Sequence, residues 1–320
     1  MNSTTASSSG EVINTKSWPW NKEIGEKANL APAKSHKNNE WPKITIVTPS
    51  YNQGEFIEET IRSIILQNYP NLEYFIIDGG STDNTVEVIK KYEDWIDYWV
   101  SEPDNGQSDA VNKGFERATG TYGNWINSDD LLAEDALLNI AKHIEGDDQK
   151  TLYLGKCIHT DKHLNIQAVQ TSNIRTIDDL LDIEHHWGKN AIAQQNVLFN
   201  VEQFREVGGL KVNNHYAMDY ELWGDLLING NSIRYLDFEV GIFRRYEGQK
   251  ISDRRKTVNC LLKSAHKLVI RNKDWSIPKK IRLTFNLFRY RLLFIKKMIS
   301  MRSRIKKKLA ARASKESVKQ

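Results

Sequence analysis

From Ile44 onward, short apolar runs alternate with longer amphipathic stretches, and no other feature restricts the fold of this chain as strongly. Four apolar runs, at residues 44–47, 72–77, 98–100 and 123–126, predict buried strands. The stretches between and after them carry apolar residues at helical spacing. The predicted helices span residues 57–65, 85–95, 108–117 and 133–144. Strands that alternate with helices are typical of a largely parallel sheet, so we predict an α/β fold.

After Thr151 the alternation becomes less regular, and we assign this part to a second half of the same domain. The strand patterns lie at residues 152–159, 166–170 and 232–244, and the helix patterns at residues 177–183 and 216–227. We predict one domain over residues 41–252, with halves at 41–150 and 151–252. A domain of this size approaches the length at which a single core stops growing, about 250–300 residues.

The first 40 residues are polar apart from Trp18, Pro19 and Trp20. Such a composition buries too little apolar surface to offset the entropy that is lost on ordering. We therefore predict a flexible N-terminal arm over residues 1–40. The sequence does not indicate where the two tryptophans dock.

Residues 253–320 form a third region, which we predict to be a helical, basic C-terminal extension. Between Asp274 and Glu316 it holds no acidic residue, while lysines and arginines alternate with large apolar residues. Such a helix can lie in a membrane interface, where each basic residue near anionic lipid contributes about 1 kcal/mol. The alternatives are a solvated helical face, which the apolar content argues against, and a nucleic-acid patch, which no nucleic-acid-binding motif accompanies. We predict an anionic membrane surface as a partner, and no nucleic acid.

Other features of the sequence predict a cytoplasmic protein that is peripheral at the inner face of the cell membrane. We find no run of about 18 apolar residues that would span a bilayer, and no basic stretch followed by an apolar signal region. Cys157 and Cys260 stand far apart and fit neither a disulfide framework nor a metal-ligand spacing. This cysteine usage is typical of a reducing compartment.

Three polar clusters come directly after predicted strands, at residues 48–52, 78–83 and 127–130. In open α/β sheets ligands bind beyond the carboxyl ends of the strands, so these clusters are the candidate site. Asp78 can accept a hydrogen bond from a base N–H, and the glycines behind it permit close approach of a ligand. The alternative is an ordinary turn in which Ser81 or Asp83 caps the next helix.

The adjacent carboxylates Asp129 and Asp130 give the third cluster a different chemistry. Neighbouring carboxylates repel one another unless a cation or hydrogen-bond donors compensate, and their oxygens suit Mg²⁺ or Mn²⁺. Such a cation would also neutralise a departing diphosphate. The alternative, in which one Asp caps the following helix, stays open on spacing alone. Asp219, in the first turn of a predicted helix, has the equally simple explanation of a favourable contact with the helix dipole.

Five motifs follow one another in a fixed order along the chain. They read Ile-Val-Thr-Pro-Ser-Tyr-Asn at 46–52, Ile-Asp-Gly-Gly-Ser-Thr-Asp-Asn-Thr at 77–85, Ser-Glu-Pro-Asp-Asn-Gly-Gln-Ser-Asp-Ala at 101–110, Trp-Ile-Asn-Ser-Asp-Asp at 125–130 and Ala-Met-Asp-Tyr-Glu-Leu-Trp at 217–223. Each is weak alone, but together they resemble glycosyltransferase family 2, the inverting group with the GT-A fold. The resemblance implies a Rossmann-like mixed, mainly parallel sheet flanked by helices. It makes 41–252 the GT-A domain, with the nucleotide-sugar half first and the acceptor half second.

The resemblance also implies roles for individual residues. Contacts with the nucleotide-sugar are implied for Pro49, Ser50, Tyr51, Asp78, Gly79, Asp109, Asn127 and Gln195. Asp129 and Asp130 would hold Mn²⁺ or Mg²⁺, and Asp219 would be the catalytic base. Asn127 stands where many relatives carry Asp, and for Gln195 ordinary amide hydrogen bonding is an equal alternative. The late segment from Arg244 to Ser252 would clamp the diphosphate.

The activity implied is that of an inverting, metal-dependent glycosyltransferase of the hexosyltransferase type. It would move a sugar from a nucleotide-sugar, with UDP the expected nucleotide, to a hydroxyl of a glycan or lipid-linked acceptor in surface polysaccharide or glycoconjugate biosynthesis. The alternative is a non-catalytic sugar-nucleotide-binding or scaffold protein on the same fold, which would have little need for Asp219. A nucleotidyltransferase would carry a Gly-rich phosphate loop where this chain has Pro-Ser-Tyr-Asn, and a processive synthase would carry spanning helices.

Overall fold

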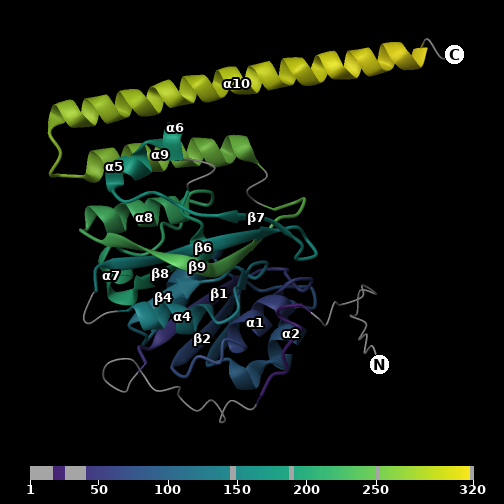
Figure 1. The fold of residues 1–320 in the computed structure, drawn as a ribbon, viewed down its shortest axis with the longest axis vertical. Coiled ribbons are helices and arrows are strands. Elements are labelled where there is room, and N and C mark those ends of the chain that lie inside the picture. The colour runs from purple at the N-terminus through teal and green to yellow at the C-terminus, as the bar shows by residue number, and fades with distance from the viewer. Residues whose placement is uncertain (1–16, 26–40, 145–148, 187–190, 250–252, 318–320) are drawn as a thin grey trace.

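The computed structural model describes residues 17–25, 41–144, 149–186, 191–249 and 253–317. Within these residues one mixed sheet is covered by helices on both faces, and two long helices, α9 and α10, follow it (Figure 1). Most of the predicted N-terminal arm, at 1–16 and 26–40, lies outside the described residues, as does the end of the predicted diphosphate clamp at 250–252.

The first half of the domain is a parallel sheet whose strands are joined by helices. Its strands are β1 (Ile44–Ser50), β2 (Leu72–Asp78), β3 (Tyr98–Ser101) and β4 (Tyr122–Trp125), and its helices are α1 (Ile57–Ile65), α2 (Thr85–Lys91) and α3 (Gln107–Arg117). β1 lies between β2 and β4, and β2 also pairs with β3. β1 and β2 lie inside the sheet and are almost wholly buried, so their sequences are mainly apolar, whereas β3 is only partly buried.

Residues 131–244, which begin at the end of the first half and continue through the second, extend the same sheet, largely with antiparallel strands. The order is β3-β2-β1-β4-β8-β6-β9-β5, with β7 paired to β6. The added strands are β5 (Leu131–Leu132), β6 (Thr151–Thr160), β7 (Ile166–Gln170), β8 (Val197–Asn200) and β9 (Ser232–Arg244), of which β9 runs parallel to β6. The helices are α4 (Ala136–His143), α5 (Ile177–Leu181), α6 (Ile183–His186), α7 (Val201–Glu206) and α8 (Met218–Ile228). The predicted mixed α/β fold is confirmed, although β5, β8 and α7 were not among the predicted elements.

Apolar side chains pack on both faces of the sheet and fix the helices to it. Ile46 of β1 packs in one buried cluster with Ile61 of α1, whereas Val47, on the opposite face, packs in the other with helices α3 and α8. Trp223 of α8 stacks on Trp125 of β4 with ring centroids 5.9 Å apart. This contact holds the first turn of α8 near the carboxyl end of β4.

The C-terminal extension is helical, as predicted, in the residues that the structure describes. α9 (Arg254–Arg271) packs against α8, and α10 (Ile277–Ser317) lies along α9 and continues past the body of the molecule (Figure 1). In the described part of the chain, no helix is long and apolar enough to cross a membrane.

Candidate active site

A cleft of about 1350 Å³ opens where the carboxyl ends of β1, β2 and β4 face the first turn of α8. Nine of the residues predicted for the site line this cleft. They are Pro49, Ser50, Tyr51, Gly79, Asn127, Asp129, Asp130, Gln195 and Asp219. The structure therefore brings together residues that lie up to 170 positions apart, since Pro49 and Asp219 share one cavity.

Asp78 lies behind the cleft wall instead of in it. Its carboxylate is fully buried and accepts hydrogen bonds from the backbone N–H of Ser81 at 2.8 Å and from the hydroxyl of Ser101 at 2.6 Å. These bonds hold the loop that presents Gly79 and Gly80 to the cleft. A Cβ on Gly79 would lie 2.9 Å from an oxygen of Asp104, so a larger residue there would displace the Asp104 side chain. Contact between Asp78 and a nucleotide base stays a prediction.

Asp109 also lies outside the set of residues that line the cleft. Its Oδ2 accepts hydrogen bonds from the backbone and side chain of Asn105, at 2.9 and 3.2 Å, and so closes the loop before α3. From the same loop and helix it is Asp104 and Gln107 that line the cleft. Neither of these two is among the residues predicted for the site, although both belong to the motif that contains Asp109.

Asp130 is fully buried and is held by three donors. Its Oδ2 accepts from Gln195 Nε2 at 2.6 Å and Asn127 Nδ2 at 3.1 Å, and its Oδ1 accepts from the backbone N–H of Arg244 at 3.1 Å. Burial, and secondarily the charge of Asp129, raise the pKa of Asp130 well above its ordinary value. An ionised Asp at position 127 could not donate this bond to Asp130.

Asp129 is less buried than its neighbour and faces the cleft. Its Oδ2 accepts hydrogen bonds from the hydroxyl of Tyr246 at 3.0 Å and from Gln249 Nε2 at 3.1 Å. Neither Asp129 nor Asp130 caps a helix, because β5 follows them and α4 has Asp135 as its N-cap residue. The capping alternative is therefore wrong.

The donor set around Asp129 fits a divalent cation that is shared with a ligand. Among the described residues, no three His, Cys, Asp or Glu side chains come together as a metal site. Mg²⁺ is typically bound through one or two carboxylates together with substrate phosphates, and this arrangement needs no larger protein cage. Because the Asp130 oxygens already accept three hydrogen bonds, the geometry favours Asp129 for contact with the cation.

Asp219 lies in the first turn of α8 and lines the cleft. Its Oδ1 accepts the backbone N–H of Tyr220 at 2.8 Å. The preceding residue, Met218, receives a hydrogen bond on its sulfur from Ser108 of α3 at 2.9 Å, which ties the start of α8 to the first half of the domain.

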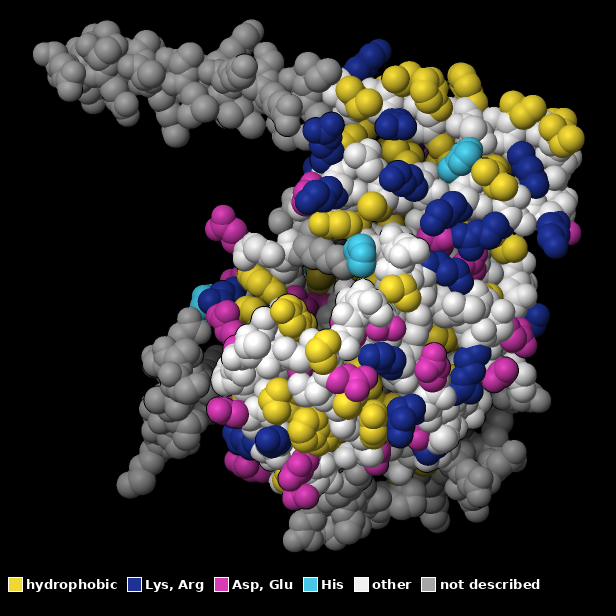
Figure 2. Space-filling view, turned by 180° about the vertical axis from the view of Figure 1, so that it is seen from behind, with side chains coloured by type: hydrophobic (Ala, Val, Ile, Leu, Met, Phe, Trp, Pro, Cys, Tyr) yellow, Lys and Arg dark blue, Asp and Glu magenta, His cyan; other side chains and the backbone are white. Residues whose placement is uncertain are grey.

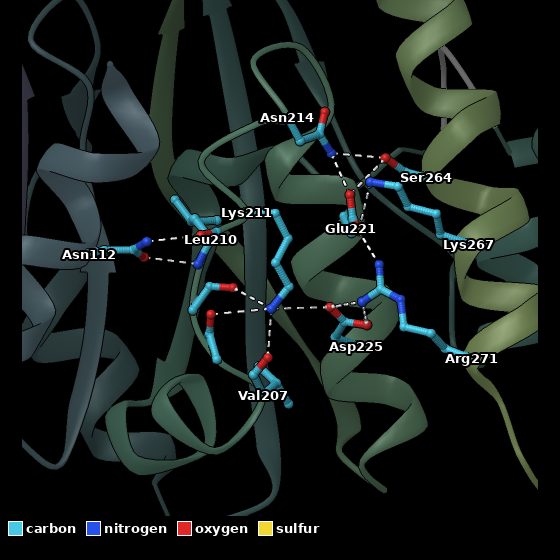
Figure 3. Close-up of polar contacts among 12 residues, drawn as sticks. Asn112, Val207, Leu210, Lys211, Asn214, Glu221, Asp225, Ser264, Lys267 and Arg271 are labelled. Atoms are coloured by element: carbon cyan, nitrogen blue, oxygen red, sulfur yellow. Dashed lines mark hydrogen bonds and ion pairs between the residues drawn. The ribbon is translucent and has the colours of Figure 1, made fainter. Parts of the chain in front are cut away.

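A network of charged side chains fixes α8 to α9 (Figure 3). Arg271 of α9 pairs with the buried Glu221 and, at 2.9 Å, with Asp225. Burial alone would raise the pKa of Glu221, but hydrogen bonds from Arg271 and Ser264 hold that pKa below its ordinary value. Asn214 bonds both Glu221 and the backbone oxygen just before α8, at 2.7 and 2.8 Å. The helix start that carries Asp219 is thereby held in place.

Arg244, predicted to be part of a diphosphate clamp, is buried and engaged with protein groups. Its Nε donates to the backbone oxygen of Asp129 at 3.0 Å, its Nη1 donates to that of Lys162 at 3.0 Å, and its Nη2 pairs with Glu59. Its side chain is only 2% exposed. The clamp prediction is wrong for Arg244, whereas Arg245 next to it lines the cleft.

The sequence of this chain is similar to those of known glycosyltransferases. Residues 45–207 match the family described as Glycosyl transferase family 2. TuaG of Bacillus subtilis, named for teichuronic acid biosynthesis, is 37% identical over 99 residues, which cover 30% of this chain and 39% of that protein. The region that matches this chain is thus well under two thirds of the length of TuaG.

Solved structures share the fold at low sequence identity. S. aureus TarS 1–349 in complex with UDP-GlcNAc gives a TM-score of 0.61 at 17% identity, covering 77% of this chain and 71% of that one. The mannosyltransferase PcManGT from Pyrobaculum calidifontis, solved with GDP-Man and Mn²⁺, gives 0.56 at 20% identity, covering 81% and 72%. Since the family match spans half of the sequence, the chain belongs to glycosyl transferase family 2.

Proposed function

We propose that the chain is an inverting, metal-dependent glycosyltransferase of the hexosyltransferase type, which moves a sugar from a nucleotide-sugar to an acceptor hydroxyl. The observation that carries this proposal is that Asp129 and Asp219, from opposite halves of the domain, line one cleft. A UDP-sugar is the preferred donor, because the TarS complex contains UDP-GlcNAc, although PcManGT was solved with GDP-Man. The name of TuaG, which refers to teichuronic acid biosynthesis, supports a role in surface polysaccharide biosynthesis. The acceptor in this proposal is a glycan or a lipid-linked molecule.

The donor side of the cleft provides a binding surface for the nucleotide. Tyr51 is 61% exposed at the end of β1 and offers a ring face against which a base can stack. Gly79 and Gly80 allow the nucleotide to approach the backbone. Asp129, held by Tyr246 and Gln249, would hold Mn²⁺ or Mg²⁺ against the diphosphate. When bound, this cation supplies positive charge that neutralises the departing group.

Asp219 is the proposed general base. It accepts the proton of the acceptor hydroxyl as that oxygen attacks the anomeric carbon from the face opposite the nucleotide. A single displacement of this kind inverts the anomeric configuration and needs no covalent glycosyl-enzyme. The contacts of Asn214 and Glu221 hold the start of α8, so that the carboxylate is positioned before the acceptor arrives.

A panel of nucleotide-sugars in a thermal-shift assay tests the donor and the cation together. We expect one UDP-sugar to raise the Tm only when Mn²⁺ or Mg²⁺ is present, since a ligand at 100 times its Kd stabilises by about 2.7 kcal/mol. The same panel without metal, and the metal alone, are the controls. A binding protein without activity would show the shift but no transfer, whereas the absence of any donor shift would contradict both functions.

We further propose that α10 rests on an anionic membrane surface at the inner, cytoplasmic face of the cell membrane. Leu283 and Leu287 of α10 are buried in the core cluster. The opposite side of the helix carries an outer stripe of exposed apolar residues, namely Ile277, Ile281, Phe285, Phe288, Leu292 and Ile295. Figure 2 shows these apolar side chains along the outer edge of the molecule, with Lys and Arg beside them. A second copy is a poorer occupant, because it would bring two strongly basic helices together, each of which holds no acidic residue before Glu316.

Replacing Phe285 and Phe288 by Glu is expected to abolish binding to vesicles that contain phosphatidylserine. Both rings are more than half exposed, so the change removes apolar insertion and adds repulsion without disturbing the core. Vesicle sedimentation of the full chain measures the effect. The matched control is the exposed pair Ile166 and Val169 of β7, changed to Glu in the same way. Equal binding by both double variants, or equal wild-type binding to neutral vesicles, would refute the proposal.

A further inference from the structure

Residues 17–25, for which the sequence gives no role, dock beside the turn that carries Asp129. We call this segment the N-terminal clasp. The indole Nε1 of Trp18 donates to the backbone oxygen of Leu132 at 2.9 Å, and Lys22 pairs with Glu134 at 2.6 Å. Leu132 and Glu134 follow the Asp129–Asp130 turn directly, so the clasp holds the chain as it leaves the candidate metal site.

The N-terminal clasp also contacts α1. Arg62 of α1 donates to the backbone oxygens of Pro19 at 3.3 Å and Lys22 at 2.8 Å. The guanidinium of the same arginine lies 4.4 Å from the ring centroid of Trp20, a cation–π contact in a largely buried position. The clasp therefore joins α1 to the segment after Asp130, two parts of the fold that lie about 70 residues apart in sequence.

From α1 a chain of contacts leads to Asp129. The indole Nε1 of Trp20 donates to Glu59 Oε1 at 3.3 Å, and the other oxygen of Glu59 pairs with the buried Arg244. Arg244 in turn holds the backbone oxygen of Asp129 through its Nε, at 3.0 Å, and the carboxylate of Asp130 through its backbone N–H, at 3.1 Å. Each link fixes the orientation of the next.

A second set of contacts from α1 reaches the Asp129 carboxylate itself. The ring centroids of Phe56 and Tyr246 lie 4.7 Å apart. The guanidinium carbon of Arg244 lies 4.8 Å from the Phe56 ring centroid. The hydroxyl of Tyr246 donates to Asp129 Oδ2 at 3.0 Å. Thr60 donates to the backbone oxygen of Asp130 at 2.7 Å. The first turns of α1 are thus the support on which the Asp129–Asp130 turn rests.

We propose that the N-terminal clasp is a positioning element for the candidate metal-binding turn, and that Trp20 acts on Asp129 through Glu59 and Arg244. This inference rests on the proposed function, in which Asp129 faces the cation. Contacts just outside a metal's own ligands orient those ligands, and losing one typically costs about 10–100-fold in metal affinity. Trp20 is three contacts away from Asp129 and Glu59 is two, so the effect of Trp20 should be the smaller.

The variant Trp20→Phe tests the inference, because it keeps a ring over Arg62 and removes only the N–H that reaches Glu59. We expect Mn²⁺ to bind the full chain in the presence of UDP about threefold to tenfold more weakly, and Glu59→Gln to weaken it about 10–100-fold. Isothermal titration with MnCl₂ measures binding without turnover. Without ligand, the Tm of Trp20→Phe should stay within about 3 °C of the wild-type value, whereas a merely structural role of Trp20 would predict a larger loss.

Two comparisons separate the relay from general loosening. Trp99→Phe, in β3 and outside the clasp, should leave Mn²⁺ affinity unchanged. The double variant Trp20→Phe/Glu59→Gln should bind no more weakly than Glu59→Gln alone, because both changes break the same relay. Full additivity, or an unchanged affinity in Trp20→Phe, would overturn the proposal.

Hydrogen exchange without any ligand separates this inference from the proposed function. Trp20→Phe should speed amide exchange at residues 127–134, and Trp99→Phe should not. If the wild type does not bind Mn²⁺ in the presence of UDP or in the presence of GDP, the proposed function fails. Faster exchange at residues 127–134 in Trp20→Phe would still support the positioning role. Unchanged exchange there would refute the clasp.

Discussion

Replacing Asp219 by Asn is expected to lower kcat by about 10²–10⁴-fold while donor binding is retained. The amide has nearly the same shape and keeps an oxygen that can accept the N–H of Tyr220, so the first turn of α8 should persist. It cannot take up the proton of an acceptor hydroxyl. Transfer assays measure the loss, and the thermal shift produced by the donor with Mn²⁺ shows that the cleft still binds.

The matched control for this variant is Asp225→Asn on the same helix. Asp225 pairs with Arg271 of α9 and belongs to the network of Figure 3, outside the cleft. Its replacement should lower the free energy of unfolding by about 1–2 kcal/mol and change kcat by less than about threefold. If Asp219→Asn transferred sugar at the wild-type rate, Asp219 would lose its role as base. Equal losses in both variants would attribute the effect to α8 as a whole.

The strands of the first half were predictable because each is an apolar run bounded by turn residues. The boundaries of β1 and β2 extend the predicted runs only by the polar residues at their ends. β5 is two residues long and β8 is four. The strands that pair with β8, which are β4 and β6, lie far from it in the sequence. Short strands of this kind carry little local pattern, and the direction of their pairing depends on the whole sheet.

The site was predictable as a region but less so residue by residue. Strand ends gave the three clusters, since parallel strands place their carboxyl ends on one edge. In the first turn of a helix, residues two positions apart point to different sides, and the fold decides which side faces the ligand. Gln107 and Asp109 belong to one motif, yet Gln107 lines the cleft and Asp109 closes the preceding loop. Sequence spacing does not separate these two outcomes.

The support behind the site was not predictable from the sequence. Glu59 and Arg244 lie 185 positions apart, and nothing in either local pattern indicates the pairing. Glu59 falls in an amphipathic helix, where an acidic residue is ordinarily solvated. Only the tertiary fold brings the two charges together, because α1 packs against β5 and β5 pairs with the end of β9. An alignment of relatives would be the signal able to reveal the pairing.

Asp129→Asn is expected to remove the Mn²⁺-dependent donor shift and nearly all transfer. The Asp129 carboxylate faces the cleft, and Tyr246 and Gln249 both donate to the same one of its two oxygens. An amide keeps the shape but loses the negative charge that a divalent cation requires. The loss of metal affinity should exceed the roughly 10–100-fold that loss of an outer contact costs. The Tm without ligand should change little.

Asp130→Asn provides the contrasting result, because its carboxylate is enclosed by donors. An amide there must point its NH₂ either at Gln195 and Asn127 or at the backbone N–H of Arg244, and each choice sets donor against donor. The variant should therefore unfold more easily, by about 1–3 kcal/mol, in urea titrations. At temperatures where it stays folded, it should retain a Mn²⁺-dependent donor shift that Asp129→Asn lacks. A stable Asp130 variant without metal response would instead make both carboxylates cation ligands.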